Sequence, residues 1–254
     1  MEYLLVKVIK EVGKMKIFRN ILKVVLILIV IYSLASFYNR IYYKVVASFN
    51  YPNFNKVVVI DPGHGGVDPG KVGSQGELEK DLNLKIAQKL SYFIEESGGV
   101  AILTRNEDKG LYTEGPSKLR EKKNEDLRNR RKLIQESNGD ILISIHLNSF
   151  PSPKYYGAQT FYLEGDMESE TLAKYVQEEL RTLLNRGNHR QIESSDSFYI
   201  LKENGIPSIL VEGGFLSNPE EEKLLNDEKY QNKIAWAIYS GIMNYYSYVE
   251  TISR

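Results

Sequence analysis

The sequence predicts an α/β fold: a single three-layer domain with a mostly parallel central sheet flanked by helices, preceded by an N-terminal membrane anchor or signal helix. Three observations support this prediction. Segments typical of strands and of helices alternate from residue 56 onward. Two strongly apolar runs, Val57–Ile60 and Ile141–Ile145, are each followed closely by a histidine. One apolar run near the amino terminus follows a basic segment.

Composition limits the classes of function. The 254 residues include 33 basic and 33 acidic side chains, so the formal net charge is zero and no basic excess indicates nucleic acid as a partner. The chain has no cysteine, which excludes thiolate metal ligands, disulfides and a cysteine nucleophile. Its length allows one sizeable domain plus an appendage.

The amino-terminal segment predicts a membrane anchor. Residues 1–23 carry positive charges that place this end in the cytosol, and residues 24–38 form the apolar run. A run of roughly fifteen to eighteen residues lies between a signal-peptide core and a full spanning helix. Bulky Phe37 stands where a cleavage site would need small residues. We expect an uncleaved signal anchor, with a cleaved signal as the alternative, then a linker at 39–55 and an extracytoplasmic domain at 56–248.

The first predicted strand delivers a histidine to the edge of the sheet. Val57–Ile60 leads into Asp61-Pro62-Gly63, where proline removes a hydrogen-bond donor and glycine permits turn dihedrals. His64 therefore lies on a loop past the carboxyl end of a strand, where open α/β sheets bind ligands. The glycine-rich loop that follows carries no phosphate-binding motif. A lone loop histidine is more often a surface residue, so this interpretation needs support from elsewhere in the chain.

Glu79 opens the next predicted helix. The apolar residues of this helix recur at helical spacing: Leu82, Ile86, Leu90 and Phe93. A carboxylate in the first turn of a helix is stabilised in its charged form by the helix dipole. One imidazole and one anionic oxygen thus come from adjacent loops, which is half of a metal site.

The following segments lead up to the second histidine. Residues 100–104 are predicted as a strand, and residues 105–123 as a long polar loop. A charged helix is predicted from Asn124 or Asp126 to about Ser137. The apolar stripe that we expect this helix to bury consists of Leu127, Leu133 and Ile134.

A second strong strand, Asp140–Asn148, carries His146 near its end. If both strands run parallel, right-handed crossovers bring their carboxyl ends to the same edge, so His64 and His146 converge. Asn148 shares the face of His146 in an extended chain, and we expect it to contact substrate. His189 is the rival third ligand, but it lies in a polar loop with no strand to aim it, so we expect it to be exposed.

The last third of the chain continues the alternation. We predict strands at 158–163, 198–201 and 206–211. A helix at 171–184 is expected to bury Leu172, Val176, Leu180 and Leu183, and a final helix at 230–246 is expected to bury Ile234, Ile238 and Ile242. Between them, Asn218 caps another predicted helix. Glu212 directly follows the apolar run 206–211, where an unpaired carboxylate would be costly. It is either a structural acid satisfied by backbone donors or an arginine, or a general base.

These residues form one constellation at the predicted edge. His64, Glu79 and His146 give three nitrogen and oxygen ligands with one open position, which suits catalytic zinc. Zinc would polarise a substrate carbonyl, and Glu212, outside the ligand set, would move the proton. The chemistry implied is metal-assisted amide hydrolysis.

Four motifs carry a family resemblance. They are Asp-Pro-Gly-His-Gly-Gly at 61–66, Glu-Lys-Asp-Leu-Asn-Leu at 79–84, Ser-Ile-His-Leu-Asn at 144–148 and Val-Glu-Gly-Gly-Phe-Leu-Ser-Asn at 211–218. With these motifs the chain resembles the zinc-dependent N-acetylmuramoyl-L-alanine amidases from about residue 56 to residue 246. The resemblance implies zinc on His64, Glu79 and His146, with Glu212 as catalytic acid/base. The bond cut would join the lactyl group of muramic acid to L-alanine of the peptidoglycan stem peptide.

Within that family the chain looks most like the germination-specific spore-cortex subgroup, through residues 125–130 and 151–162. That likeness implies a role in forming the muramic-lactam of spore cortex. The sequence has no wall-binding repeat, so we expect the membrane segment or a protein partner to target and control the enzyme. Two other functions stay open at this point: a wall-binding protein without turnover, and a zinc peptidase acting within the stem peptide.

Overall fold

The computed structural model describes residues 2–48, 51–53, 55–115, 118–184 and 187–253. The chain divides into two compact units, Met1–Asn50 and Tyr51–Arg254. Each unit is described by itself below.

The first unit is one helix, α1 (Glu2–Ser48). Its stretch Arg19–Tyr42 spans 24 residues and contains an 18-residue window with a mean hydropathy of 2.3 and no buried residue, so it is long and apolar enough to cross a membrane. This stretch is longer than the predicted run at 24–38. The helix also covers residues 39–48 of the expected linker, and residues 49, 50 and 54 of that linker lie outside the described residues.

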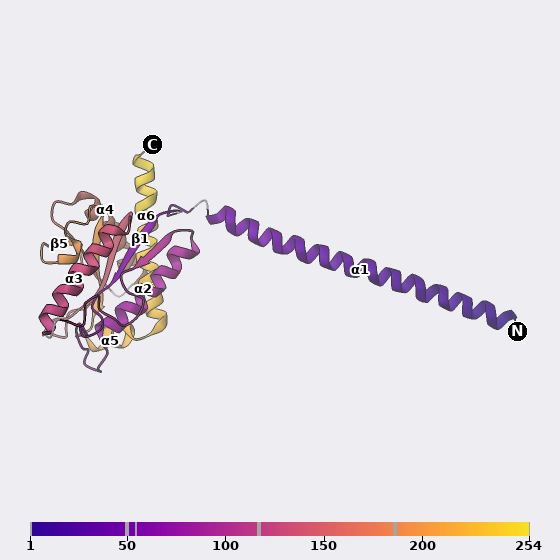
Figure 1. Cartoon of the computed structure of the whole chain (residues 1–254), viewed down its shortest axis with the longest axis horizontal. Coiled ribbons are helices and arrows are strands. Elements are labelled where there is room, and N and C mark those ends of the chain that lie inside the picture. Colours follow the sequence, from indigo (N-terminus) through magenta and orange to yellow (C-terminus); the bar gives the residue numbers. More distant parts are fainter. Residues whose placement is uncertain (1, 49–50, 54, 116–117, 185–186, 254) are drawn as a thin grey trace. The chain divides into compact units, whose positions relative to one another are not determined.

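The second unit is built on a six-stranded sheet with the order β2-β1-β3-β6-β4-β5. The strands are β1 (Val57–Pro62), β2 (Val100–Leu103), β3 (Ile141–Asn148), β4 (Gln159–Tyr162), β5 (Glu193–Ser194) and β6 (Ser208–Phe215). The neighbours β2, β1, β3 and β6 are parallel, whereas β4 runs antiparallel to β6 and parallel to β5. The prediction of a mostly parallel sheet is therefore confirmed. Figure 1 labels strands β1 and β5 of this sheet.

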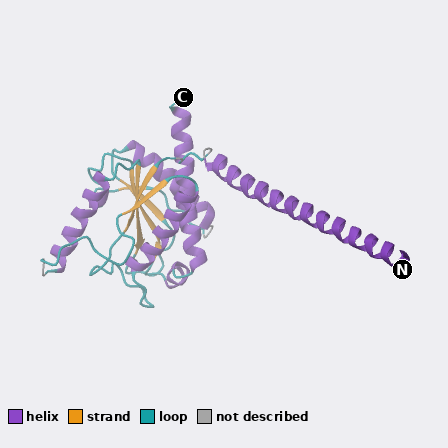
Figure 2. Cartoon of the chain, turned by 45° about the vertical axis from the view of Figure 1, so that its right-hand side comes forward, coloured by secondary structure: helices purple, strands orange, loops and turns teal. Residues whose placement is uncertain are grey.

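Helices cover both faces of this sheet. They are α2 (Glu79–Glu96), α3 (Leu119–Glu136), α4 (Met167–Leu184), the 3-10 turn η1 (Tyr199–Leu201), α5 (Pro219–Leu225) and α6 (Glu228–Ile252). The larger core joins α2, α4 and α6 to one face, and the smaller core joins α3 and η1 to the other. Figure 2 shows the sheet between these helical layers. Because β1, β3 and β6 are buried on both faces, their sequences are nearly continuous apolar runs.

Helix α3 differs from its prediction. It begins at Leu119, earlier than expected, and its buried residues are Asp126, Arg130 and Ile134. Only Ile134 of the predicted stripe is buried, because Leu127 is 37% exposed and Leu133 is half-buried. The face of α3 that turns toward the sheet is thus selected by a polar pair, Asp126 and Arg130, one helical turn apart.

Three other predictions need correction. Residues 198–201 contain the 3-10 turn η1 rather than a strand, because a short apolar run does not distinguish a strand from a buried turn. Leu183 is 36% exposed, and Leu184 is buried instead. Strand β6 continues past residue 211 to Phe215, so Glu212 lies inside the strand and not after it.

Candidate metal centre

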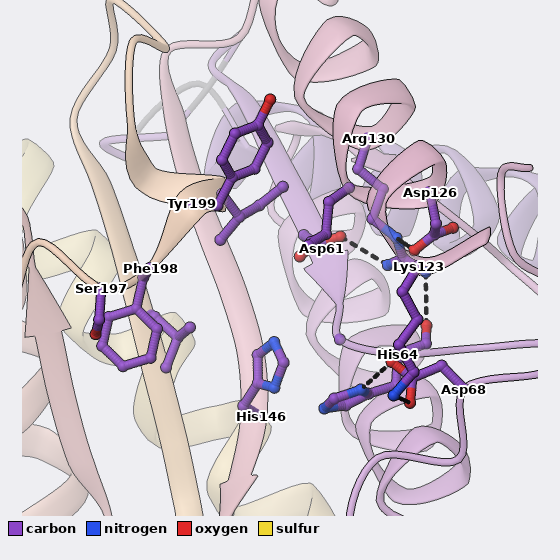
Figure 3. Close-up of a pocket in the computed structure, with 14 residues that line it drawn as sticks. Asp61, His64, Asp68, Lys123, Asp126, Arg130, His146, Ser197, Phe198 and Tyr199 are labelled. Carbon is purple, nitrogen blue, oxygen red and sulfur yellow. Dashed lines mark hydrogen bonds and ion pairs between the residues drawn. The ribbon is translucent and has the colours of Figure 1, made fainter. Parts of the chain in front are cut away.

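The loop after β1 takes a backbone conformation that brings it under β3. His64 has a φ of 63°, in the left-handed region that few residues other than glycine adopt. A Cβ at Gly63 would lie 2.3 Å from Nε2 of the His146 ring, so only glycine lets the loop pass beneath that imidazole. The close approach places both imidazoles in one space, which Figure 3 shows for His64 and His146.

His64, Glu79 and His146 come together at the carboxyl edge of the sheet. One nitrogen or oxygen of each lies within 4.8 Å of those of the other two. The Glu79 Oε1 atom is 3.1 Å from His64 Nε2 and 3.0 Å from His146 Nδ1. The two imidazole rings are 4.9 Å apart and nearly perpendicular. Two imidazoles and one carboxylate, with their ligand atoms already converging, fit the donor set of a catalytic zinc site.

Glu79 is buried and surrounded by hydrogen-bond donors. Its Oε2 accepts from the Lys71 amide at 2.8 Å, and its Oε1 accepts from the Leu147 amide at 3.1 Å. Burial alone would raise the pKa of the Glu79 carboxyl, but hydrogen bonds from His146 and His64 hold that pKa well below its usual range. Glu79 is therefore ionised, which is the form a metal needs.

Asp68 orients His64. Its Oδ2 lies 2.8 Å from His64 Nδ1, and its Oδ1 lies 2.6 Å from the ammonium of Lys123. Burial lowers the pKa of His64, but the hydrogen bonds to Asp68 and Glu79 outweigh burial and raise that pKa to about 9. With Nδ1 engaged by Asp68, the ring presents Nε2 to the centre, as expected for a carboxylate behind a metal-binding histidine. Asp68 was not among the sequence-based candidates, and its only signal was an acid four residues from His64 in a glycine-rich loop.

Glu212 faces the same centre from the neighbouring strand, where it pairs in register with His146. A register shift follows it, because three residues of β6 oppose two of β3, which places a bulge at Gly213-Gly214. The side chain is half-buried, and its Oε2 is buried without a hydrogen-bond partner among the described residues. For that oxygen, the alternative of an acid satisfied by backbone donors or an arginine does not hold. Burial is the main cause that raises the pKa of Glu212 to about 7, and the charge of Glu79 adds to it.

The other two candidates lie outside this group. Asn148 ends β3, half-buried, and its Oδ1 accepts a hydrogen bond from the Ser149 amide at 2.8 Å. His189 is exposed, as predicted, and is not part of the cluster.

A cavity of about 260 Å³, the metal-side cavity, opens beside the two histidines. Its lining residues are Asp61, Gly63, His64, Asp68, Lys123, Asp126, Leu127, Arg130, His146, Ser197, Phe198, Tyr199, Ile200 and Leu210. Charged residues from the β1 loop and α3 form one wall, and apolar residues of the η1 segment form the other (Figure 3). Such a cavity can hold a chain that has both polar and apolar groups.

The fold and the site together define a class: an α/β protein with a two-histidine, one-glutamate candidate metal centre at the carboxyl edge of its sheet. A family model described as N-acetylmuramoyl-L-alanine amidase matches residues 58–244. The chain belongs to this family, and it is an N-acetylmuramoyl-L-alanine amidase by enzyme class. The resemblance predicted from the four motifs is confirmed.

Individual relatives agree with this assignment. The germination-specific N-acetylmuramoyl-L-alanine amidase of Bacillus subtilis (strain 168) is 43% identical over 196 residues, which cover 77% of this chain and 82% of that protein. The CwlD amidase from Clostridioides difficile, solved in complex with the GerS lipoprotein, has a TM-score of 0.75 and 51% identity, and the match covers 76% of this chain and 99% of that chain. An N-acetylmuramoyl-L-alanine amidase from Clostridium difficile 630 has a TM-score of 0.66 and 32% identity, and the match covers 75% of this chain and 96% of that chain.

Proposed function

We propose that this amidase is zinc-dependent and hydrolyses the amide between the lactyl group of muramic acid and L-alanine of peptidoglycan stem peptides. One observation carries the proposal: His64, Glu79 and His146 converge within 4.8 Å at the edge where Glu212 stands on the adjacent strand. The donor set and a nearby carboxylate outside it are the parts that metal-assisted amide hydrolysis needs.

Each residue has a separate task in this proposal. Zinc held by His64, Glu79 and His146 supplies a Lewis acid for the amide carbonyl. Glu212 takes the proton of the attacking water and passes it to the leaving amine. A carboxyl whose pKa is about 7 suits both halves of that transfer near neutral pH.

The metal-side cavity supports a peptide substrate. It lies beside both histidines, and it has one charged wall and one apolar wall. A stem peptide likewise has polar groups along its backbone and apolar groups in its side chains. Lys123 lines the charged wall, and its side chain is 40% exposed, which gives a carboxylate of the peptide a cation to approach. Asn148, two residues beyond His146 on β3, is proposed to contact substrate through its amide.

The cellular role is proposed from the relatives and from α1. The similarity to a germination-specific amidase supports a role in spore cortex, where removal of the peptide permits formation of the muramic-lactam. The stretch Arg19–Tyr42 supports anchoring in a membrane, with the domain at 56–248 held outside the cytoplasm. A regulatory protein partner is proposed because the similar CwlD amidase was solved with a lipoprotein.

The experiment that tests the reaction uses the full chain in detergent, purified peptidoglycan and mass spectrometry of the products. We expect free stem peptides that begin with L-alanine, loss of their release on adding a chelator, and recovery on adding zinc. Products that leave L-alanine on muramic acid would show a peptidase instead. A protein that binds peptidoglycan but releases nothing would show a wall-binding function without turnover.

The cortex role has its own test. Spore muropeptides from cells lacking this protein should contain little or no muramic-lactam, and cells complemented with the full chain should recover it. An unchanged muropeptide profile would place the enzyme's action outside cortex maturation.

A further inference from the structure

Two arginines are buried behind the loop that carries His64. Arg105 follows β2, and Arg130 lies in α3, and the side chain of each is 1% exposed. A guanidinium is costly to bury unless its N–H groups find partners and its charge is balanced. Neither arginine belongs to the ligand set or carries the proposed proton transfer, so their burial needs another explanation.

Arg130 binds the loop and two acids. Its Nη1 donates to the Pro62 carbonyl at 2.7 Å and to Asp61 Oδ1 at 2.9 Å, and its Nη2 donates to the His64 carbonyl at 2.6 Å. Its Nε donates to Asp126 Oδ2 at 2.7 Å. Asp61 and Asp126 balance the charge of Arg130, and Figure 3 shows the three side chains together.

Arg105 binds main-chain carbonyls. Its Nε donates to the Pro62 carbonyl at 2.9 Å, and its Nη2 donates to the Gly63 carbonyl at 3.0 Å and to the Lys80 carbonyl at 2.7 Å. Lys80 is the residue after Glu79 in the first turn of α2. One guanidinium therefore joins the loop that carries His64 to the helix that carries Glu79.

The carbonyl groups of three consecutive residues, Pro62, Gly63 and His64, all accept from these guanidiniums. His64 stands in this segment with its φ of 63°. A left-handed conformation is unfavourable for a residue other than glycine, and it persists only where the surroundings fix it. The hydrogen bonds from Arg105 and Arg130 are such a restraint.

We propose that Arg105 and Arg130 are positioning residues of the metal centre, which hold the His64 loop in its left-handed turn and at a set spacing from Glu79 before the metal binds. The inference rests on the proposed function, because it assumes that the centre binds zinc. In this proposal the two arginines increase the affinity of the centre for zinc, and they do not contact the reacting atoms. Preorganised ligands bind more tightly because the ordering cost is met in the folding of the protein.

The test compares the zinc affinity of variants of the full chain in detergent. Arg105→Lys and Arg130→Lys keep a positive charge but lose the forked geometry that reaches several carbonyls at once. We expect the Kd for zinc, measured by competition with a chromophoric chelator, to rise about 10- to 100-fold in each variant. Relative to the wild type, the turnover of each arginine variant should be much closer to normal at saturating zinc than at limiting zinc.

Two controls separate positioning from general loss of stability. Ser144→Ala removes the 2.8 Å hydrogen bond from Ser144 to Asp61 in the same buried network but leaves the hydrogen bonds of both arginines to the loop carbonyls in place. Arg181→Lys makes the same chemical change on α4. Both controls should keep the wild-type Kd for zinc, even where Ser144→Ala lowers the thermal midpoint of the metal-free protein.

The outcomes are distinct. Wild-type affinity in both arginine variants, or an equal loss of affinity in Ser144→Ala, would overturn the positioning role. Should one arginine variant fail to fold, the other decides, because the two guanidiniums reach the loop through separate atoms. A wild-type protein that binds no zinc would instead remove the proposed function itself.

Discussion

The acidic residues on the two sides of the metal centre, the side of the β1 loop with the start of α2 and the side of β6, have pKa values shifted in opposite directions. On the β1 side, Asp61, Asp68 and Glu79 each accept hydrogen bonds or pair with cations, and the pKa of each is lowered although burial opposes this. On the β6 side, Glu212 has a buried Oε2 without a partner among the described residues, and burial raises its pKa to about 7. Residues of one chemical class thus differ in protonation because of the groups around them.

This difference assigns the roles. An acid that stays ionised can hold a cation, and an acid that titrates near neutral pH can move a proton. Glu79 and Glu212 lie at the same edge of one sheet, but Glu79 is at the start of a helix facing donors, whereas Glu212 is in a strand that is apolar before it. The local backbone decides how many donors each carboxylate meets. Substitutions of these acids, or of the groups that they contact, test which acid holds the metal and which one moves the proton.

The largest expected effect is on turnover. Glu212→Gln keeps the size of the side chain but cannot accept the proton, so we expect the release of stem peptides to fall about 10³-fold. Zinc content should stay at the wild-type level, because Glu212 is not among the three residues that form the candidate metal cluster. Turnover is measured by mass spectrometry of released peptides, and zinc by elemental analysis of the purified full chain.

Glu178→Gln is the matched control, since Glu178 is an exposed acid on α4. It should retain full turnover. Wild-type turnover in Glu212→Gln would remove Glu212 from the reaction, and loss of zinc in that variant would make it a ligand and not the proton carrier.

The next effect concerns the stability of the β1 side. Asp61 is buried and bonds to Arg130, Thr104 and Ser144, so Asp61→Asn leaves the Arg130 charge less balanced. We expect the free energy of unfolding at pH 7 to fall by about 3–5 kcal/mol. The folded-state pKa of Asp61 is lowered, so its contribution is present above the unfolded pKa of roughly 3.9 and is lost as the pH falls further. The gap between variant and wild type should therefore close in acid.

Urea denaturation of the full chain in detergent measures this gap. The chain has one tryptophan, Trp236, which contacts Phe93 and Tyr239 in the second unit, so its fluorescence reports unfolding of that unit. Asn53→Ala supplies a comparison, because Asn53 is equally buried but belongs to no ion pair of the centre. A gap for Asp61→Asn that did not change with pH would show that the ionised form of Asp61 has no special partner.

The contrast also explains what the sequence could predict. The runs 57–60, 141–145 and 206–211 predict strands because buried parallel strands are apolar throughout, and parallel crossovers then bring His64, Glu79, His146 and Glu212 to one edge. These predictions depend on patterns within a few residues. The same local reasoning gave the cap at Asn218, whose side chain accepts from the amides of Glu220 and Glu221.

The polar network behind the β1 loop could not be predicted in this way. Arg105 reaches the Gly63 carbonyl across 42 residues of chain, and Arg130 reaches the His64 carbonyl across 66. No periodicity marks a polar residue that will be buried. The stripe predicted on α3 is correct at Ile134 but wrong at Leu127 for the same reason, since the buried face carries Asp126 and Arg130 instead. Tertiary partners select these residues, and a single sequence does not show those partners.

A smaller effect, with the opposite sign, is expected on the β6 side. In the metal-free protein, Glu212→Gln should raise the free energy of unfolding at pH 8 by about 2–3 kcal/mol. The folded-state pKa of Glu212 is about 7 and its unfolded pKa is roughly 4.3, so the ionised carboxylate destabilises the folded state above pH 7. The gain should shrink as the pH falls through 7 and vanish near pH 4. Trp236 fluorescence in urea measures this gain. A difference between variant and wild type that is the same at pH 8 and pH 4 would contradict the buried, unpartnered state of this acid.

The smallest effect is expected at Asp68, which shapes the centre without belonging to it. Asp68→Asn keeps an acceptor for His64 Nδ1 but removes the negative charge that also pairs with Lys123. Because the ring keeps its orientation while its basicity falls, zinc affinity should weaken by about 10-fold. Glu107→Gln, which changes an exposed acid of the neighbouring loop, should leave the Kd for zinc unaltered. Unchanged affinity in Asp68→Asn would mean that the charge behind His64 does not act on the metal. A loss far above 100-fold would instead make Asp68 a metal ligand, together with His64, Glu79 and His146.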